Sequence, residues 1–317
     1  MVEKKRVFEG ISGIGPESEK KLLEAGITRI DKLASMSVEE LNDLLKCGEG
    51  KAREIIRQAL ERDIAFFAPA TKFKSEVYDK MQRITSGSKA IDELMGGGFP
   101  TMNIVTVSGE FGSGKTQLAM QLAVNVQLPP EKGGLSGKAV YIDTENSFSP
   151  ARIMKMAEAV GLDPQKALEN ILLVKATNTD HIEIAVDKLE DLLENGAKIR
   201  LLVVDSFISQ FRAEYSTLDV LVTRQRKMLK LLDRLKKIAW RYNILIYLTN
   251  QVVVDFSSIP GVSTMRPAGG FVMGHWGGIQ IYLRRGKKRI FAIRDSPEQP
   301  ERETVFEITE EGIKDVE

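Results

Sequence analysis

The stretch Gly109-Glu110-Phe111-Gly112-Ser113-Gly114-Lys115-Thr116 decides the fold, because it is a complete G-x-x-x-x-G-K-T phosphate loop. The apolar run 104–107 before it predicts a buried strand, and residues 117–126 after it have the apolar spacing of a helix. A glycine loop between a strand and a helix directs backbone N–H groups and the helix dipole at an anion. This order of strand, glycine loop and helix therefore predicts a nucleoside triphosphate site. In this site Lys115 reaches the phosphates and the Thr116 hydroxyl ligates Mg²⁺.

Length and composition narrow the class of protein. A chain of 317 residues has room for about two domains. The 45 lysines and arginines nearly cancel the 44 aspartates and glutamates, so contact with nucleic acid must come from local patches. Cys47 is the only cysteine, which excludes an internal disulfide and suits a reducing cytoplasm. Since neither a secretory signal nor a membrane-spanning apolar run is visible, we expect a cytoplasmic protein with no membrane partner.

Residues 1–65 are predicted to form a small all-α domain. Glycine turns at 13–15 and 48–50 each precede a predicted helix with lysine near its start, as in helix-hairpin-helix units. Such turns present N–H groups to the phosphates of a nucleic-acid backbone. A plain helical bundle that serves protein contacts would show the same pattern, and the sequence leaves both interpretations open. Ser37 and Glu40 are predicted to form a capping box.

Residues 66–80 are predicted to be an extended linker, because Pro69 breaks the helical pattern. From 81 to 317 strands and helices alternate, which predicts an α/β core: a mostly parallel sheet flanked by helices. The C-terminal part is instead predicted to be an antiparallel ribbon. The candidate strands are 104–108, 139–143, 171–176, 201–205 and 244–249 in the parallel part, and 279–283, 289–294 and 305–309 in the ribbon.

Three of these strands end in polar side chains that suit nucleotide hydrolysis. Asp205 follows a buried run and is predicted to hold Mg²⁺ through water. Glu145, just beyond the strand that ends at Asp143, is the candidate that orients the attacking water. Gln251 is the candidate that senses the γ-phosphate and signals to the loop after it. Alternatively, these are ordinary polar residues at strand ends.

Together, YIDTE at 141–145, LLVVDS at 201–206 and LTNQV at 248–252 around GEFGSGKT resemble the RecA/RadA family of recombinases from archaea and eukaryotes. The resemblance covers nearly the whole chain. It implies a RecA-type ATPase core behind a helix-hairpin-helix domain, with ATP and Mg²⁺ as cofactors. It also implies a DNA-dependent ATPase for repair and recombination that forms filaments on single-stranded DNA and pairs it with double-stranded DNA. Shorter matches are TSGS at 85–88, LMGGG at 94–98, QLPP at 127–130, FRAEY at 211–215, YLR at 282–284 and DSP at 295–297.

The resemblance further implies contacts between subunits. Phe67 and Ala70 match a Phe-x-x-Ala motif that docks on the neighbouring subunit and builds a helical filament or a ring. Alternatively, Phe67 closes the N-terminal core. Arg152 is implied to pack on the adenine. The segment Asp295-Ser296-Pro297 is implied to cover the ATP of an adjacent subunit, and His275 to reach that shared site.

DNA is implied to lie along the filament axis against two loops. The first follows Phe211 and includes Arg212 and Arg224; the second spans 252–270 and contains Arg266. Arg224 and Arg226, at the start of a basic helix, are the preferred phosphate contacts. A basic helix that is only a solvated face is the alternative.

The chain departs from the family pattern at three places. Thr217-Leu218-Asp219 replaces Gly-Arg-Gly in the first DNA loop, Phe148-Ser149-Pro150-Ala151-Arg152 lacks one arginine, and Phe271 replaces histidine after Gly269-Gly270. The nucleotide motifs are intact. The alternative function is therefore a recombinase paralogue, an ATP-binding mediator with little strand exchange; recombination mediators are possible partners in either case.

Overall fold

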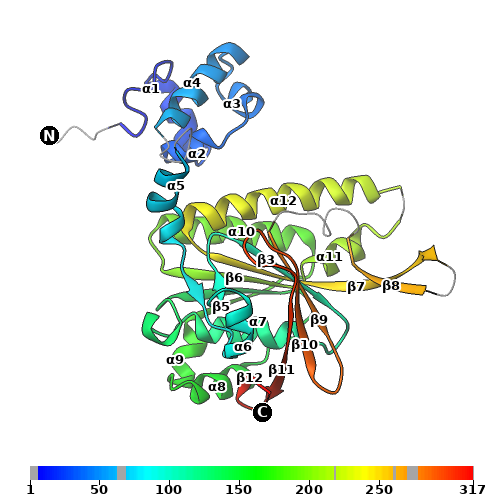
Figure 1. The fold of residues 1–317 in the computed structure, drawn as a ribbon. Helices are drawn as coiled ribbons and strands as arrows, with labels where there is room; N and C mark the ends of the chain where they lie inside the picture. Colours follow the sequence, from blue (N-terminus) through cyan, green and yellow to red (C-terminus); the bar gives the residue numbers. More distant parts are fainter. Residues whose placement is uncertain (1–5, 63–68, 218, 260–261, 270–277, 317) are drawn as a thin grey trace. The chain divides into compact units, whose positions relative to one another are not determined.

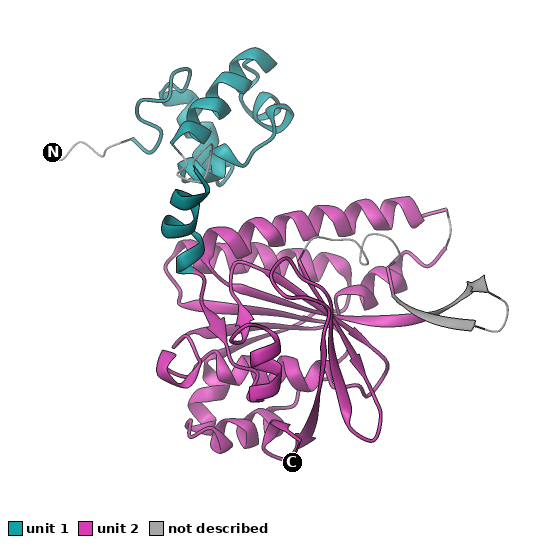
Figure 2. Ribbon diagram, in the orientation of Figure 1, with its two compact units in different colours: residues 1–80 teal, residues 81–317 magenta. Residues whose placement is uncertain are grey.

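The computed structural model describes residues 6–62, 69–217, 219–259, 262–269 and 278–316, and between 254 and 267 it describes the backbone only. Two compact units divide the chain, Met1–Lys80 and Met81–Glu317 (Figure 2). None of the helices in the described part of the chain is long and apolar enough to cross a membrane.

The first unit is helical, as predicted. Leu22, Leu33, Leu41 and Ile55 are fully buried and form the centre of its own core. Ser37 forms the predicted capping box with Glu40, since each side chain accepts from the other residue's backbone N–H. The helices are α1 (Pro16–Glu24), α2 (Ile30–Ala34), α3 (Val38–Leu45), α4 (Glu49–Glu61) and α5 (Ala70–Glu76), followed by the 3₁₀ turn η1 (Tyr78–Lys80).

The prediction of an extended linker over 66–80 is wrong from residue 70 onward, where α5 and η1 lie. Pro69 stands at the N-cap of α5 with φ −56° and does not interrupt the helix. Its missing N–H and fixed φ disfavour a helix before it but suit the start of one. The residues that follow, Ala-Thr-Lys-Phe-Lys-Ser-Glu, contain no helix breaker.

The second unit is built on one large sheet with the predicted parallel part and antiparallel ribbon (Figure 1). The strands follow in the order β12-β11-β10-β9-β3-β7-β6-β4-β5. Neighbours from β9 to β5 pair in parallel, and those from β9 to β12 pair antiparallel. Their bounds are β3 (Ile104–Gly109), β4 (Lys138–Asp143), β5 (Ile171–Lys175), β6 (Ile199–Asp205), β7 (Leu245–Ile259), β9 (Ile279–Arg284), β10 (Arg289–Asp295), β11 (Glu303–Thr309) and β12 (Gly312–Asp315).

Helices cover both faces of this sheet, which explains why its strands are apolar at nearly every position. Alternate residues face alternate layers: Leu201 and Val203 pack with α7, whereas Leu202 and Val204 pack with α12. The helices on the first face are α6 (Lys89–Leu94), α7 (Lys115–Asn125), α8 (Pro150–Ala159) and α9 (Pro164–Glu169); those on the second are α10 (Thr179–Glu194), α11 (Phe207–Glu214) and α12 (Leu221–Tyr242).

The predicted second DNA loop, residues 252–270, is largely a β-ribbon. β7 continues past its last sheet partner, Gln251, and pairs antiparallel with β8 (Val262–Pro267). The β-branched run Val252-Val253-Val254 favours an extended backbone, and the ribbon supplies the hydrogen bonds that the sheet no longer offers. The two-stranded ribbon therefore projects beyond the sheet (Figure 1).

Three short strands escaped sequence reasoning: β1 (Arg83–Ile84), β2 (Phe99–Pro100) and β12. β12 fastens the end of the chain to α6, because the Asp315 carboxylate accepts from the Ser88 hydroxyl and from the backbone N–H groups of Lys89 and Ala90. Strands of two to four residues carry no periodicity that a sequence pattern can register.

Candidate functional site

The carboxyl ends of the parallel strands bring the predicted nucleotide residues to one edge of the sheet. Asp143 is level with Asp205 on the neighbouring strand, and Gly109 is level with Gln251. Strand β7, which carries Gln251, lies between β3 and β6. The phosphate loop, both aspartates and the glutamine, which are spread over more than a hundred residues of sequence, therefore meet at one edge of the sheet.

The phosphate loop has the backbone that an anion cradle needs. Gly112 and Gly114 have φ of 74° and 112°, a region that residues with a Cβ atom rarely adopt. α7 begins at Lys115, directly after the loop. The Ser113 hydroxyl is buried and has no hydrogen-bond partner among the described residues. A phosphate oxygen would satisfy such a group, so the loop suits a phosphate ligand.

Lys115 lies at the centre of the loop. Its ammonium donates to the carbonyl oxygens of Gly109 and Glu110, both at 2.9 Å, which leaves one of its three donors without a partner among the described residues. Burial lowers the pKa of Lys115, and the charges of Asp205 and Glu145 act in the opposite direction. A cation that is desolvated in this way interacts strongly with a phosphate.

Asp205 is almost fully buried, and three hydroxyl groups surround its carboxylate. Oδ2 accepts from the Tyr141 hydroxyl at 2.9 Å and from the Ser147 hydroxyl at 3.2 Å. Oδ1 accepts from the Thr249 hydroxyl. Burial raises the pKa of Tyr141 well above its usual range, so its hydroxyl stays protonated and donates. The carboxylate is thus fixed from several strands.

Asp143 shapes the turn that carries Glu145. One of its carboxylate oxygens accepts from the backbone N–H groups of Glu145 at 3.2 Å and Ser147 at 3.1 Å. The other accepts from the N–H of Phe148 at 3.1 Å. Because Asp143 is buried and bound to three backbone donors, it positions the turn and leaves Glu145 exposed to solvent.

A chain of side-chain contacts leads from Glu145 to the start of the predicted DNA region. Gln251 Nε2 donates to Glu145 Oε1 at 2.9 Å. The Arg212 guanidinium donates to Gln251 Oε1 at 3.4 Å, a long and therefore weak bond. Arg212 is on α11, not on a loop as expected. Gln251 thus contacts both the candidate catalytic carboxylate and a candidate DNA-binding arginine.

The residues fit a magnesium ion held with the nucleotide. Among the described residues, no group of three or more His, Cys, Asp or Glu side chains is arranged to hold a metal ion. Mg²⁺ needs no such cage, because it keeps several waters and binds one or two protein oxygens plus phosphates. Thr116 and Asp205 are the oxygen donors that would hold it. When bound, Mg²⁺ would neutralise charge that develops on the phosphates.

Arg152, on α8, is held by hydrogen bonds to three other residues. Its guanidinium donates to the Gln117 side chain at 2.7 Å and to the carbonyls of Thr309 and Glu310, each at 2.6 Å. These bonds join the first turn of α7 to the turn between β11 and β12. Contact of Arg152 with an adenine stays a prediction.

The segment Asp295-Ser296-Pro297 lies far from the phosphate loop of its own chain. Asp295 pairs with Gln280, at the start of β9, whereas Gly109 pairs with Leu283 near the end of that strand. Because β9 is parallel to β3, the segment lies at the edge of the sheet opposite to the one that carries the phosphate loop. It does not meet the loop within one subunit.

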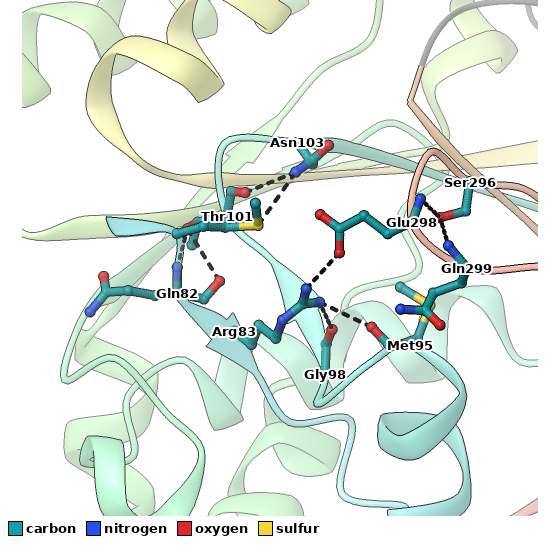
Figure 3. A network of polar contacts seen from close by, with 10 residues as sticks. Gln82, Arg83, Met95, Gly98, Thr101, Asn103, Ser296, Glu298 and Gln299 are labelled. Carbon is teal, nitrogen blue, oxygen red and sulfur yellow. Dashed lines mark hydrogen bonds and ion pairs between the residues drawn. The ribbon is translucent and has the colours of Figure 1, made fainter. Parts of the chain in front are cut away.

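Glu298, just beyond this segment, anchors it to the rest of the unit (Figure 3). Its carboxylate accepts from Arg83 at 2.8 Å, and the Arg83 guanidinium also donates to the carbonyls of Met95 at 3.0 Å and Gly98 at 3.2 Å. The Ser296 hydroxyl accepts from the backbone N–H of Glu298 at 3.2 Å, which closes a turn. The segment is therefore held in a defined position at its edge.

The candidate DNA-binding arginines are only partly free. Arg224, on α12, donates to the Tyr215 carbonyl at 3.2 Å and so fastens the start of the connection between α11 and α12. Arg226 is exposed on the same helix. The side chain of Arg266, and His275 and Phe67 as a whole, lie outside the described residues. Ala70 is exposed at the first position of α5.

Sequence reasoning missed the three hydroxyl groups around Asp205. The signal for Tyr141 was available, because it stands two positions before Asp143 and so shares its face of β4. Thr249 likewise stands two positions before Gln251 on β7. The sequence did not reveal that β6, which carries Asp205, lies between β4 and β7. Because of this strand order, the Tyr141 and Thr249 hydroxyls both reach the Asp205 carboxylate.

The parallel sheet, the phosphate loop between β3 and α7, and the acidic residues at the same edge define a phosphate-loop nucleotide-binding protein with a RecA-type core. The profile of the Rad51 family matches residues 78–316, and that of a SAM-like helix-hairpin-helix tandem matches residues 5–61. The chain belongs to the Rad51 family, which confirms the family and the fold class expected from its motifs.

Two relatives are similar over the full length of the chain. The DNA repair and recombination protein RadA of Metallosphaera sedula is 41% identical over 319 residues, which cover 99% of this chain and 98% of that protein. The DNA repair and recombination protein RadA of Aeropyrum pernix is 42% identical over 322 residues, which cover 100% of both chains. The chain is therefore RadA-like from end to end, and nothing in these similarities favours the paralogue alternative.

Proposed function

We propose that this protein is a DNA-dependent ATPase that assembles on single-stranded DNA and promotes homologous pairing and strand exchange. The observation that carries the proposal is the contact chain from Glu145 through Gln251 to Arg212. It joins the residue proposed to orient the attacking water to a residue proposed to bind DNA. The full-length similarity to proteins named for DNA repair and recombination supports the same role.

In this scheme, several residues at the edge of the sheet have separate roles in hydrolysis. Lys115 and the backbone N–H groups of the phosphate loop bind the phosphates and stabilise the charge that develops on them. Glu145 orients and deprotonates the attacking water, on a turn held by Asp143. Thr116 and Asp205 hold Mg²⁺. Gln251 contacts Glu145 and is proposed to change partners when the γ-phosphate leaves.

A second copy of the chain is proposed to complete the site. Phe111 is 96% exposed within the phosphate loop, although an aromatic side chain favours burial. Asp295-Ser296-Pro297 follows the opposite edge of the sheet, so head-to-tail stacking would bring that segment of one subunit to the phosphate loop of the next. Phe67 and Ala70 are proposed to join the subunits, and His275 to reach the shared nucleotide.

DNA is proposed to contact Arg212, Arg224, Arg226 and Arg266, with further backbone contacts from the helix-hairpin-helix domain at 1–65. The first unit has the glycine turns that such contacts require: Gly13 and Gly48 have φ of 94° and 85°. A cytoplasmic, nucleoid-associated location follows from this role. Recombination mediators remain possible partners.

A strand-exchange assay run beside a DNA-stimulated ATPase assay tests the proposal. We expect ATP hydrolysis to rise when single-stranded DNA is added, and labelled homologous duplex to be converted to joint product. Nucleotide binding with neither exchange nor DNA stimulation would refute the recombinase role and leave a mediator.

Subunit assembly has its own test, the substitution Phe67→Glu. A charge at the docking residue is expected to leave monomers, because a carboxylate does not enter an apolar pocket without a partner. Thr71→Glu adds the same charge at an exposed position of α5 and serves as the control. Large assemblies of Phe67→Glu in light scattering would overturn the docking role.

A further inference from the structure

The hydroxyl groups around Asp205 form a cage that the proposed reaction does not by itself require. We define this hydroxyl cage as the side chains of Tyr141, Ser147 and Thr249. Tyr141 and Thr249 come from β4 and β7, the two strands that flank β6, and both are fully buried. Ser147 comes from the turn that carries Glu145 and is half-buried. Three separate segments thus converge on one carboxylate.

The direction of each hydrogen bond follows from the chemistry of the acceptor. An ionised carboxylate accepts only, so Tyr141, Ser147 and Thr249 must all donate to Asp205. A carboxylate has about four acceptor positions, and the cage fills three of them. Tyr141 and Ser147 share Oδ2, so the position that remains is on Oδ1, which otherwise bonds only Thr249 among the described residues.

We propose that Tyr141 and Thr249 are positioning residues for the magnesium ion, because together with Ser147 they fix Asp205 so that a single oxygen lone pair is left for a water of the ion. This inference rests on the proposed function, which supplies the ion. A carboxylate held in this way acts through one water and does not chelate. That suits Mg²⁺, which keeps its waters, better than larger cations that take both oxygens of a carboxylate.

Tyr141→Phe tests the inference with little change of shape, since it removes one hydroxyl from a packed ring. The measurement is the affinity of the full chain for a fluorescent, non-hydrolysable ATP analogue, first in EDTA and then in rising Mg²⁺. We expect affinity in EDTA to change less than about twofold. We expect the gain in affinity on adding Mg²⁺ to fall by about tenfold, the size typical for a hydrogen bond to a charged group.

Tyr247→Phe is the matched control. Tyr247 is equally buried on β7, but its hydroxyl donates to the Lys115 backbone carbonyl at 3.1 Å and not to Asp205. This control is expected to leave the gain from Mg²⁺ unchanged, whatever it does to affinity in EDTA. If both tyrosine variants lose affinity equally with and without Mg²⁺, the role of Tyr141 is only structural and the inference is wrong.

Thr249 gives a second, independent pair of variants. Thr249→Ser keeps the hydroxyl and is expected to retain the gain from Mg²⁺, whereas Thr249→Val keeps the shape and is expected to lose it. Equal gains for Ser and Val would also overturn the inference. Should the wild-type chain bind no nucleotide, the proposed function itself fails; should it bind with a gain from Mg²⁺ that neither pair alters, only the role of the cage fails.

Discussion

Two regions of this protein are built in opposite ways: the edge of the sheet that carries the proposed nucleotide site (the nucleotide edge) and the part that carries the proposed DNA-binding arginines (the DNA region). At the nucleotide edge, the Asp143 and Asp205 carboxylates are almost fully buried, and each accepts three hydrogen bonds from its own chain. In the proposed DNA region, Arg212 and Arg226 are exposed. Among the described residues, Arg212 makes one long contact, to Gln251.

This difference shows whether the fold itself or the ligand fixes the side chains of each region. Buried polar groups must be satisfied within the fold, so the nucleotide edge is organised before any ligand arrives. Exposed arginines gain little from surface contacts and are available for phosphates, which supply the ordering contacts themselves. Substitutions at the edge should therefore impair nucleotide binding or hydrolysis itself, whereas substitutions in the DNA region should act on DNA binding and on stimulation by DNA.

The largest effect is expected from Lys115→Ala. Loss of the desolvated ammonium should lower the rate of ATP hydrolysis by about a hundredfold to a thousandfold, the range for removing a group that stabilises developing charge. Lys132→Ala, at an exposed residue of the 3₁₀ turn η2 (Pro130–Lys132), is the control and should hydrolyse ATP normally. A rate for Lys115→Ala within tenfold of wild type would contradict the role given to the loop.

Asp143→Ala is expected to be next in size. It leaves three backbone N–H groups without their acceptor, so the free energy of unfolding should fall by about 2–4 kcal/mol and ATP hydrolysis should fall with it. Chemical denaturation and a steady-state ATPase assay measure both.

Asp163→Ala is the control for that substitution, because Asp163 caps α9 through a single bond, to the Lys166 N–H at 2.9 Å. It should cost about 1 kcal/mol and leave hydrolysis unchanged. If the two variants were equally stable, the anchoring role of Asp143 would be disproved.

A smaller and more specific effect is expected from Arg212→Ala. Because Arg212 reaches Glu145 only through Gln251, hydrolysis without DNA should stay within about twofold of wild type, since the lost bond is weak. Stimulation by single-stranded DNA should largely disappear. Lys230→Ala, an exposed cation on α12, is the control. Full DNA stimulation of Arg212→Ala would break the proposed link between the two regions.

The smallest effect is expected from Arg224→Ala. One lost phosphate contact should weaken binding of single-stranded DNA a few-fold and reduce the slope of log K against log salt by about 0.7. Fluorescence anisotropy at several salt concentrations measures both quantities. Lys236→Ala, farther along α12, should keep the wild-type slope. An unaltered slope for Arg224→Ala would mean that this arginine contacts the Tyr215 carbonyl but no DNA phosphate.

Most of the fold followed from the sequence because its signals are local. The strand before the phosphate loop and the helix after it lie within one or two residues of their predicted ends. The same holds for the capping box at Ser37 and for the parallel strands that end at Asp143 and Asp205. In each case hydrophobic spacing or a capping residue within one short window is sufficient.

The predictions of secondary structure failed where a local sequence pattern was not sufficient and the rest of the fold decided the outcome. Pro69 breaks a helix that comes before it, but α5 starts from it. The run after Gln251 continues as β7 because β8 returns to pair with it, and no pattern within 252–259 announces that partner. Arg212 and Arg224 are on helices because α11 runs to Glu214 and α12 begins at Leu221, so the connection between them is shorter than the expected first DNA loop.

By itself, the sequence predicted a triphosphate site at residues 109–116 and placed Glu145, Asp205 and Gln251 at the same edge of the sheet. A phosphate loop and a strand end are properties of consecutive residues, so they are legible without a structure. Only the tertiary structure decided that Tyr141 and Thr249 hold Asp205, and that Gln251 joins Glu145 to Arg212. Those contacts depend on the order of strands in the sheet, which places side chains against partners that can lie more than a hundred residues away in the sequence.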